Sequence, residues 1–448
     1  MTDSRAASDR PWLVFDIDDT LVDTFGTSVR KCATVARRLN LTPPTAQQMA
    51  QDYGRVDFRA CVTRWHPTVD FATYAATYDS LVTEVPAEPL GDFAGLLTAA
   101  RGAGFGVGIL SNGPSRKTAR KLSALGVGPG DLDFVVDAGT ATEPKPARQA
   151  FEALFDLYGV NPRSCWYVSD SPEDWQGAAE AGYRTVAVPR ATVFTRPGPV
   201  ANLTVPGIDA LRDLLSVLCC PAPSASHRLP QAWSFDAGFT LIEHLLSPAE
   251  LIATECRTWG VSAEPDRIEA SLSQWSHLLD RTEVLWACDR SIDEGLSHFY
   301  RLVLLSLGVA DSSAAAAIIK RYTSPTNWRL RPGADTLVSR IAAAGYRLGV
   351  LANWQSSLGT VLDHVGLRGN FDAVVASAQA GAGKPSPAAF SHLASSLGIE
   401  AQAMVHVGDD PRSDVAGAIA AGARAVWAPA DLSEEGWCRT VLTATGRP

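Results

Sequence analysis

The same order of sequence segments occurs twice in this chain, and this repeat restricts its possible folds more than any other feature. Residues 12–22, WLVFDIDDTLV, return as 233–242, WSFDAGFTLI, and three later segments return in the same order. These are an apolar run ending in SNG or AN, a loop with Lys145 or Lys384, and an apolar run ending in SDSPED or GDDPRSD. Such a repeat predicts a tandem duplication of one domain.

The spacing within the two copies differs in one region. The loop lysine stands 25 residues before the acid of the last segment in both copies, whereas 95 residues separate the first acid from the end of the second apolar run in the first copy and 116 in the second. These spacings are defined by Lys145 and Asp170, Lys384 and Asp409, Asp16 and Ser111, and Asp236 and Ala352. The difference falls in a polar, helix-forming stretch, so we expect each copy to carry a helical insertion after its first strand.

Short apolar runs alternate with helix-forming segments along each copy, which is typical of an α/β fold. We expect two tandem Rossmann-like three-layer α/β/α domains with parallel sheets, each with a helical cap after the first strand. The predicted boundaries are a first domain at 1–207 with its cap at about 24–90, a Pro/Ser/Ala-rich linker at 208–230, and a second domain at 231–448 with its cap at about 243–330.

Acidic residues follow the first strand directly: Asp16, Asp18 and Asp19, with Thr20 after them. Because ligands bind beyond the carboxyl ends of the strands in an open parallel sheet, acids at this place indicate a site. The alternative is that Asp19 or Thr20 caps the next helix. Capping accounts for one such residue and not for all four, so the functional interpretation is preferred.

The net charge of -9 and the pI near 5.4 argue against a nucleic-acid or anionic-membrane partner, which would need a basic face. An anionic substrate would therefore need positive charge supplied locally, by a metal ion or by a few placed Lys and Arg. The eight cysteines form no CxxC pair, and no apolar run has the length of a membrane span or the form of a signal peptide. These features predict reduced thiols and a cytoplasmic location.

With these motifs in order, both halves of the chain resemble the haloacid dehalogenase-like superfamily, in the form that has a small helical cap between the first two motifs. The first half has all four motifs: DIDDT at Asp16, the strand end SNG at Ser111, the loop lysine Lys145 and SDSPED at Asp170. The resemblance covers nearly the whole chain apart from the termini and the linker. It implies a hydrolase that uses an aspartate as its nucleophile.

The resemblance implies a role for each motif residue. Asp16 would form an aspartyl-phosphate, and Asp18 would act first as general acid and then as base for the hydrolytic water. Mg²⁺ would be held by Asp16, the backbone carbonyl of Asp18 and Asp170, and Lys145 would add a positive charge. The other implied residues are Ser111, Asn112 and Thr20 for substrate binding and Asp174 for orienting the site.

Some residues also have a structural interpretation. Lys145 taken alone is a solvated loop residue, and Asp174 is a possible helix cap. His406 lies within an apolar segment and is interpreted as a hydrogen-bonded core histidine. Two groups lie in the insertions: Trp65, Trp275 and Trp286, which we expect to pack the caps, and Arg55, Arg59 and Arg64, which are surface charge unless they contact a second anionic group.

The second half departs from the motif pattern at two positions. Gly238 stands where the first half has Asp18, and Ala352 stands where it has Ser111. The counterparts that remain are Asp236, Thr240, Asn353, Lys384, Asp409 and Asp414. Because general acid catalysis is worth about 10²- to 10⁴-fold in rate, ordinary phosphate esters are expected to be poor substrates for this half.

We therefore predict a Mg²⁺-dependent phosphatase for a small phosphorylated metabolite, with catalysis in the first half and a catalytically impaired second half. Two alternatives remain open. One is a ligand-binding or scaffold protein without turnover. The other is a hydrolase acting through Asp236 on a substrate whose leaving group needs no proton, such as an acyl phosphate or a halide.

Overall fold

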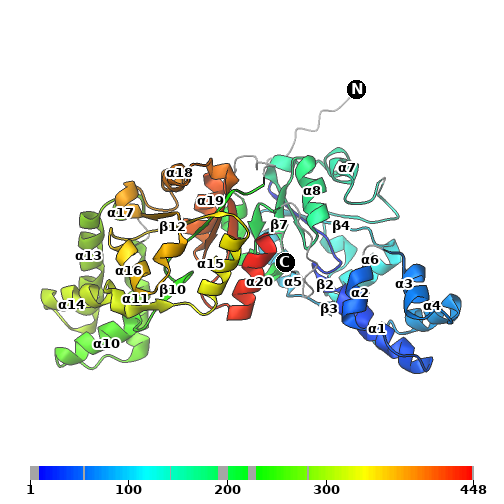
Figure 1. The fold of residues 1–448 in the computed structure, drawn as a ribbon, viewed down its shortest axis with the longest axis horizontal. Coiled ribbons are helices and arrows are strands. Elements are labelled where there is room, and N and C mark those ends of the chain that lie inside the picture. Colours follow the sequence, from blue (N-terminus) through cyan, green and yellow to red (C-terminus); the bar gives the residue numbers. More distant parts are fainter. Residues whose placement is uncertain are drawn as a thin grey trace. The chain divides into compact units, whose positions relative to one another are not determined.

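The structure is a computed structural model that describes residues 10–53, 56–141, 143–189, 200–219, 229–279 and 282–445 (Figure 1). The chain folds into two compact units. The first unit comprises Met1–Ala201, Val205–Pro221 and Thr445–Pro448, and the second comprises Asn202–Thr204 and Ala222–Ala444. Each unit contains a parallel sheet with helices and an inserted helical cap, so the predicted tandem α/β fold is confirmed.

A parallel sheet with the strand order β7-β6-β1-β4-β5 forms the centre of the first unit. All four residues of β1 are buried, because this strand lies between β4 and β6 and packs on both faces. The strands are β1 Trp12–Phe15, β4 Gly106–Leu110, β5 Phe134–Val136, β6 Cys165–Ser169 and β7 Arg184–Ala187. Asp16 therefore leaves the middle of the carboxyl edge of this sheet.

Among the described residues, the α-helices of the α/β part of the first unit are α5 Phe93–Gly102, α6 Ser115–Ala124, α7 Arg148–Tyr158, α8 Pro172–Glu180 and α9 Leu211–Leu218. The last of these is a helix at the start of the segment 208–230 that was predicted to be a linker. In α9 the leucines Leu211, Leu214 and Leu218 recur at helical spacing and are buried, so the segment packs on the first unit instead of connecting freely. Residues 220–228 of the predicted linker lie outside the described residues.

The cap of the first unit consists of α1 Thr24–Arg38, α2 Ala46–Asp52, α3 Phe58–Trp65 and α4 Phe71–Ser80. The chain enters and leaves it through two short antiparallel strands, β2 Val22–Asp23 and β3 Glu88–Pro89. Each helix begins after a residue whose side chain accepts a hydrogen bond from a backbone N–H of the first turn, namely Asp23, Thr45, Asp57 and Asp70.

The second unit has the strand order β13-β12-β9-β14-β15-β8, again parallel. The strands are β8 Leu203–Thr204, β9 Ala232–Phe235, β12 Arg347–Ala352, β13 Ala373–Ala376, β14 Met404–Gly408 and β15 Arg424–Trp427. The helices of this part are α15 Ala334–Ala343, α16 Leu358–His364, α17 Ser377–Ala380, α18 Pro387–Ser396, α19 Gly417–Ala420 and α20 Glu434–Thr445. Asp236 follows β9 as Asp16 follows β1.

The cap of the second unit is entered and left through the antiparallel strands β10 Ile242–His244 and β11 Trp328–Leu330. Its helices are α10 Pro248–Thr258, α11 Pro265–Trp275, α12 Thr282–Leu285, α13 Asp289–Leu307 and α14 Ser312–Tyr322. They enclose an apolar core of their own, against which Trp275 and Trp286 pack, as expected. None of the described helices combines the length with the apolar character that a membrane crossing requires.

Candidate active site

Lys145 and two carboxylates form a buried group beside the first strand of the first unit. The Lys145 ammonium lies 2.6 Å from Asp16 Oδ1 and 2.7 Å from Asp174 Oδ2, and it donates to the Tyr167 hydroxyl at 2.8 Å. Burial opposes the charged form, but the two carboxylates outweigh it and raise the pKa of Lys145. Lys145 is therefore a buried cation with three acceptors, and the interpretation as a solvated loop residue is wrong.

Two opposing effects act on the pKa of the Asp16 carboxyl. Burial raises its pKa to about 6, while the nearby Lys145 ammonium lowers it. Its backbone N–H donates to the Val168 carbonyl at 2.9 Å, which continues the β1–β6 ladder one residue beyond the strand. The carboxyl group is thus held next to the end of β6, the strand that leads to Asp170.

Asp174 accepts three hydrogen bonds, from Lys145, from the Tyr167 hydroxyl at 3.0 Å and from the Ser169 hydroxyl at 3.3 Å. The cap of the helix that contains it is Ser171, whose side chain accepts from the Asp174 backbone N–H. Asp174 is therefore not the helix cap, and its side chain orients Lys145 toward Asp16.

The three residues predicted to bind substrate all have partners within the protein. Asn112 pairs with the main chain of Lys145, accepting from its N–H and donating to its carbonyl, both at 2.8 Å. The Thr20 hydroxyl donates to Asp170 Oδ1 and accepts from the Asp170 N–H, both at 3.0 Å. The Ser111 hydroxyl oxygen accepts from the Gly113 N–H at 3.0 Å. Asn112 and Thr20 therefore position Lys145 and Asp170, and their role in substrate binding stays a prediction.

Asp18 faces the loop after β4. A Cβ atom placed on Gly113 would lie 3.9 Å from Asp18 Oδ2 and 3.2 Å from Ser111 Oγ, so the first two motifs meet around this glycine. The Thr24 hydroxyl donates to Asp18 Oδ1 at 2.6 Å, and the Lys121 ammonium of α6 forms an ion pair with the same oxygen. Burial raises the pKa of Asp18, but Lys121 and Thr24 together bring it below its usual value.

Sequence reasoning missed Lys121. The residue lies 103 positions from Asp18, outside every motif, and only the packing of α6 brings it to the site. The visible signal was the basic run SRKTARK directly after SNGP. Asp19, by contrast, agrees with the capping alternative: it has a positive φ of 57°, and its carboxylate accepts from the Phe25 N–H in the first turn of α1 at 2.8 Å.

The second unit repeats the buried lysine group. The Lys384 ammonium lies 2.5 Å from both Asp236 Oδ1 and Asp414 Oδ1, and Asn353 pairs with the Lys384 main chain as Asn112 does with that of Lys145. Burial raises the pKa of Asp236 to about 7. Despite its burial, Asp414 has a pKa well below its usual range because of Lys384 and His406.

One extra residue separates the two acids in the second copy, since Asp409 and Asp414 are five positions apart and Asp170 and Asp174 are four. The backbone absorbs this residue in a π-helical turn, Pro411–Ala416, where the first unit has the start of α8. Because of this turn, Asp414 still contacts Lys384, so the extra residue does not disrupt the buried lysine group.

His406 is a core histidine, as expected, and it occupies the place that Tyr167 has in the first unit. Its Nε2 lies 3.2 Å from Asp414 Oδ1 and its Nδ1 lies 2.8 Å from the Ser234 hydroxyl. Burial lowers the pKa of His406, while the contact with Asp414 opposes this effect.

Aromatic side chains surround Gly238, at the position of the missing acid. A Cβ atom on this glycine would lie 3.5 Å from the Trp354 ring, which stands where the first unit has Gly113. Trp354 packs on Trp328 with ring centroids 4.8 Å apart, and Trp328 donates from its indole N–H to the Tyr322 carbonyl. The differences at these two positions compensate in volume. In the first unit the Asp18 carboxylate faces Gly113, and in the second unit Gly238 faces the Trp354 indole.

Oxygen ligands for a hard cation are present in both units. In the second unit, carboxylate oxygens of Asp236, Asp409 and Asp414 lie within 4.8 Å of one another. In the first unit, Asp16 and Asp170 are buried carboxylates beyond the ends of the neighbouring strands β1 and β6. Carboxylates of this kind fit Mg²⁺. Burial and the neighbouring carboxylates also raise the pKa of Asp409 to about 8, an effect that a bound cation would oppose.

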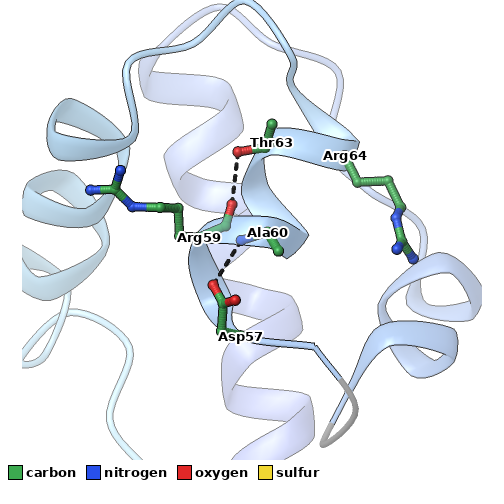
Figure 2. Close-up of a pocket in the computed structure, with 5 residues that line it drawn as sticks. All are labelled: Asp57, Arg59, Ala60, Thr63 and Arg64. Atoms are coloured by element: carbon green, nitrogen blue, oxygen red, sulfur yellow. Dashed lines mark hydrogen bonds between the residues drawn. The ribbon is translucent and has the colours of Figure 1, made fainter.

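A surface cavity of about 420 Å³ lies on the cap of the first unit, lined by Asp57, Arg59, Ala60, Thr63 and Arg64 (Figure 2). Arg59 and Arg64 point to opposite sides of α3 in this view. The Arg59 guanidinium stacks on Phe71, and Arg64 pairs with the buried Asp52. Both therefore stabilise the cap and do not converge on a ligand, while Arg55 lies outside the described residues. Trp65 packs in the cap and donates to Asp52.

Comparison with known proteins places both halves among related hydrolases. Residues 13–188 match a family model described as haloacid dehalogenase-like hydrolase, and residues 252–422 match another model of that description, which begins after Asp236. Haloacid dehalogenase-like hydrolase domain-containing protein 3 of Homo sapiens is 29% identical over 209 residues, which cover 44% of this chain and 81% of the relative.

Two further relatives have names that state an activity. Phosphoglycolate phosphatase of Rhodospirillum rubrum is 32% identical over 172 residues, covering 36% of this chain and 69% of the relative. Haloacetate dehalogenase H-2 of a Moraxella species is 30% identical over 131 residues, covering 29% of this chain and 58% of the relative. The similarity thus extends both to a protein named as a phosphatase and to one named as a dehalogenase.

Proposed function

Because the chain belongs to the haloacid dehalogenase-like hydrolases, we propose that its first unit is a Mg²⁺-dependent phosphatase that hydrolyses a small phosphorylated metabolite through Asp16. The observation that carries the proposal is the buried group of Asp16, Lys145 and Asp174 at the carboxyl edge of the sheet, with Asp18 facing the same loop. A nucleophile, a cation and a proton donor are together there.

In the first step, a carboxylate oxygen of Asp16 attacks the phosphorus atom of the ester, and the bond from phosphorus to the alcohol oxygen breaks. Asp18 gives its proton to that oxygen, so the alcohol leaves neutral. Lys145 favours the ionised form of the Asp16 carboxyl against its burial, and the 2.6 Å contact orients this carboxyl through Oδ1.

In the second step, water attacks the phosphorus atom of the aspartyl-phosphate while Asp18, now ionised, takes a proton from it. The bond from phosphorus to Asp16 breaks, and inorganic phosphate leaves. Asp16, Asp170 and the Asp18 carbonyl would hold Mg²⁺, which would neutralise charge on the phosphoryl oxygens. Thr20 keeps the Asp170 carboxylate oriented for this through its two hydrogen bonds.

We propose that the second unit is catalytically impaired toward phosphate esters. Gly238 offers no proton, Ala352 offers no hydroxyl, and the Trp354 ring lies 3.5 Å from the place that a Cβ atom at position 238 would take. The retained Asp236, Lys384 and Asp409 are compatible with binding a ligand without turning it over.

The test is phosphate release from a panel of sugar, nucleotide and aryl phosphates with and without Mg²⁺. We expect Asp16→Asn to abolish release, Asp18→Asn to lower it about 10²- to 10⁴-fold with alkyl esters, and Asp236→Asn to leave it unchanged. Asp236→Asn is the matched control, since it makes the same change in the other unit. Activity that survives Asp16→Asn but is lost in Asp236→Asn would reverse the assignment of the two units.

A halide-releasing activity of the second unit is the remaining candidate, because one relative is named as a haloacetate dehalogenase and Gly238 removes the acid that a halide leaving group does not need. Incubation with chloroacetate decides it. Chloride release that depends on Asp236 would establish this activity, and its absence would leave the second unit as a non-catalytic domain.

A further inference from the structure

Helix α6, directly after the second motif, carries an unusual amount of positive charge. Four of its ten residues are basic and none is acidic: Arg116, Lys117, Arg120 and Lys121. The chain as a whole has a net charge of -9. The corresponding helix of the second unit, α16, has no lysine or arginine and buries Leu358, Val361 and Leu362. The basic character therefore belongs to the first site and not to the fold.

The placement of these charges is unfavourable for the helix itself. Arg116 and Lys117 lie in the first turn, where the helix dipole favours negative charge, and each has another basic residue four positions later. Thr118 and Leu122 are buried and form the inward face, so the cations line the outer and lateral faces. A helix arranged in this way gains stability when an anion binds to it.

Lys121 connects this helix to the chemistry, because its ammonium pairs with Asp18. Asp18 is the residue that would protonate the leaving oxygen. The cations next to it therefore lie on the side of the site that receives the alcohol part of the substrate, and not on the side of the transferred phosphoryl group.

Lys31, on α1 of the cap, belongs to the same cluster. Its ammonium lies 5.1 Å from the centroid of the Tyr78 ring. Burial is the main cause of its lowered pKa; the charge of Asp79 opposes this effect, and the smaller effects of Arg120, Lys117 and Lys121 add to it. Within the described part of the chain, no carboxylate lies in ion-pair distance of Lys31, Lys117 or Arg120.

From this arrangement we infer that the first site takes phosphate esters whose alcohol part carries a second anionic group, a carboxylate or a second phosphate, bound between Lys31, Lys117 and Lys121. The inference rests on the proposed phosphatase function and adds the substrate class. It also gives Lys121 a second partner: a substrate anion that pairs with this lysine releases Asp18 from it.

The test compares three substrates on one carbon skeleton at the same Mg²⁺ concentration. Glycerol 3-phosphate has no second anion, 3-phosphoglycerate has a carboxylate in place of the terminal hydroxymethyl group, and glycerol 1,3-bisphosphate has a second phosphate. We expect kcat/KM to be about tenfold higher for at least one of the two doubly anionic substrates, which corresponds to about 1.4 kcal/mol. Which of the two is preferred identifies the anionic group.

Lys117→Gln and Lys31→Gln are the informative variants, because neither residue belongs to the catalytic group. Each is expected to lower the preference about three- to fivefold, through KM and only for the doubly anionic substrates. Lys320→Gln, an exposed lysine on α14 of the second unit, is the matched control and should change nothing. Equal kcat/KM for all three substrates in the wild type, or an equal loss for all three in Lys117→Gln, would overturn the inference.

Calorimetric binding to Asp16→Asn separates this inference from the proposed function. If the wild type hydrolyses none of the substrates, the phosphatase proposal fails. Tighter binding of the doubly anionic compounds, weakened by Lys117→Gln, would still support the anion subsite. Equal binding of all three compounds would refute it.

Discussion

Asp18 is a carboxylate whose neighbours oppose the role proposed for it. Its side chain is about one third exposed, and the free protein holds it ionised through Lys121 and Thr24. A proton donor must be protonated when the ester bond breaks, so the ion pair with Lys121 has to loosen as substrate binds. This makes Lys121 the residue that sets the pH range over which the first step is possible.

Lys121→Met is expected to raise the pKa of Asp18, because the burial that raises it is then no longer offset by the ammonium group. Since kcat/KM reports the protonation of the free enzyme, its alkaline limb should move to higher pH. The measurement is the pH profile of kcat/KM with glycerol 3-phosphate, which has no second anion.

The control for this prediction is Lys117→Met, which removes a lysine of the same helix that does not contact Asp18. Its alkaline limb should coincide with that of the wild type. A limb that stays in place in Lys121→Met, or that moves by the same amount in both variants, would show that the ion pair does not govern the protonation of Asp18.

At the scale of elements, the two units achieve similar geometry with different backbones. The buried lysine contacts two carboxylates in both, although the first reaches its second carboxylate from α8 and the second from a π-helical turn. Helices α6 and α16 follow the same strand end, yet one is basic and the other apolar. The contacts of the buried lysines Lys145 and Lys384 are thus similar in the two units. Helices α6 and α16, on the side proposed to receive the leaving group, differ.

Arg116→Glu is expected to stabilise the first unit by about 0.3–1 kcal/mol, because a negative charge in the first turn of α6 interacts favourably with the helix dipole. The same change should weaken kcat/KM for doubly anionic substrates. The measurement is the denaturant midpoint of the full chain together with the kinetics. Arg116→Gln, which removes the charge without reversing it, should give a smaller effect of the same sign.

A destabilised Arg116→Glu protein would contradict the view that the cations of α6 oppose the stability of their own helix. Unchanged stability in both variants would contradict it as well. Either result would mean that Arg116 stabilises the folded protein through a partner outside the described residues.

At the scale of the whole molecule, the chain contains two sites of the same ancestry with different electrostatics. In the second unit, burial raises the pKa of Asp236 to about 7 and that of Asp409 to about 8. Groups whose pKa is raised in the folded state contribute stability that is present below their unfolded pKa and is lost as the pH rises through the folded value. The metal-free second unit should therefore become less stable as the pH rises from about 4 to about 8.

Mg²⁺ is expected to reverse this trend, because it binds the ionised carboxylates. At 100 times its dissociation constant the ion would add about 2.7 kcal/mol. The measurement is calorimetric unfolding of Asp170→Asn, which removes a ligand from the first site, with and without Mg²⁺ at pH 6 and pH 8.5. The Mg²⁺-induced rise in Tm should be larger at pH 8.5 and absent in Asp170→Asn/Asp409→Asn. An equal rise at both pH values would refute the prediction.

The sequence by itself determined the fold class, the duplication and the identity of the group around Asp16. The reason is physical: parallel strands deliver their carboxyl ends to one edge, so residues such as Asp16 and Asp170 that follow neighbouring strands must meet there. The helix-forming stretch after each first strand predicted the helical insertions. Residues such as Asp23, whose side chain accepts a backbone hydrogen bond, cap the start of these helices.

Only the tertiary structure decided what lies opposite Asp18 and Gly238. Lys121 reaches Asp18 because the buried face of α6, with Leu122, sets the rotation of that helix on the sheet, and rotation depends on packing between segments far apart in the chain. Trp354 reaches Gly238 for the same reason, since an indole fills the volume that the missing carboxylate leaves. The local sequence shows which residue types are present, and the packing of helices and loops on the sheet decides which of these residues lie in the same site.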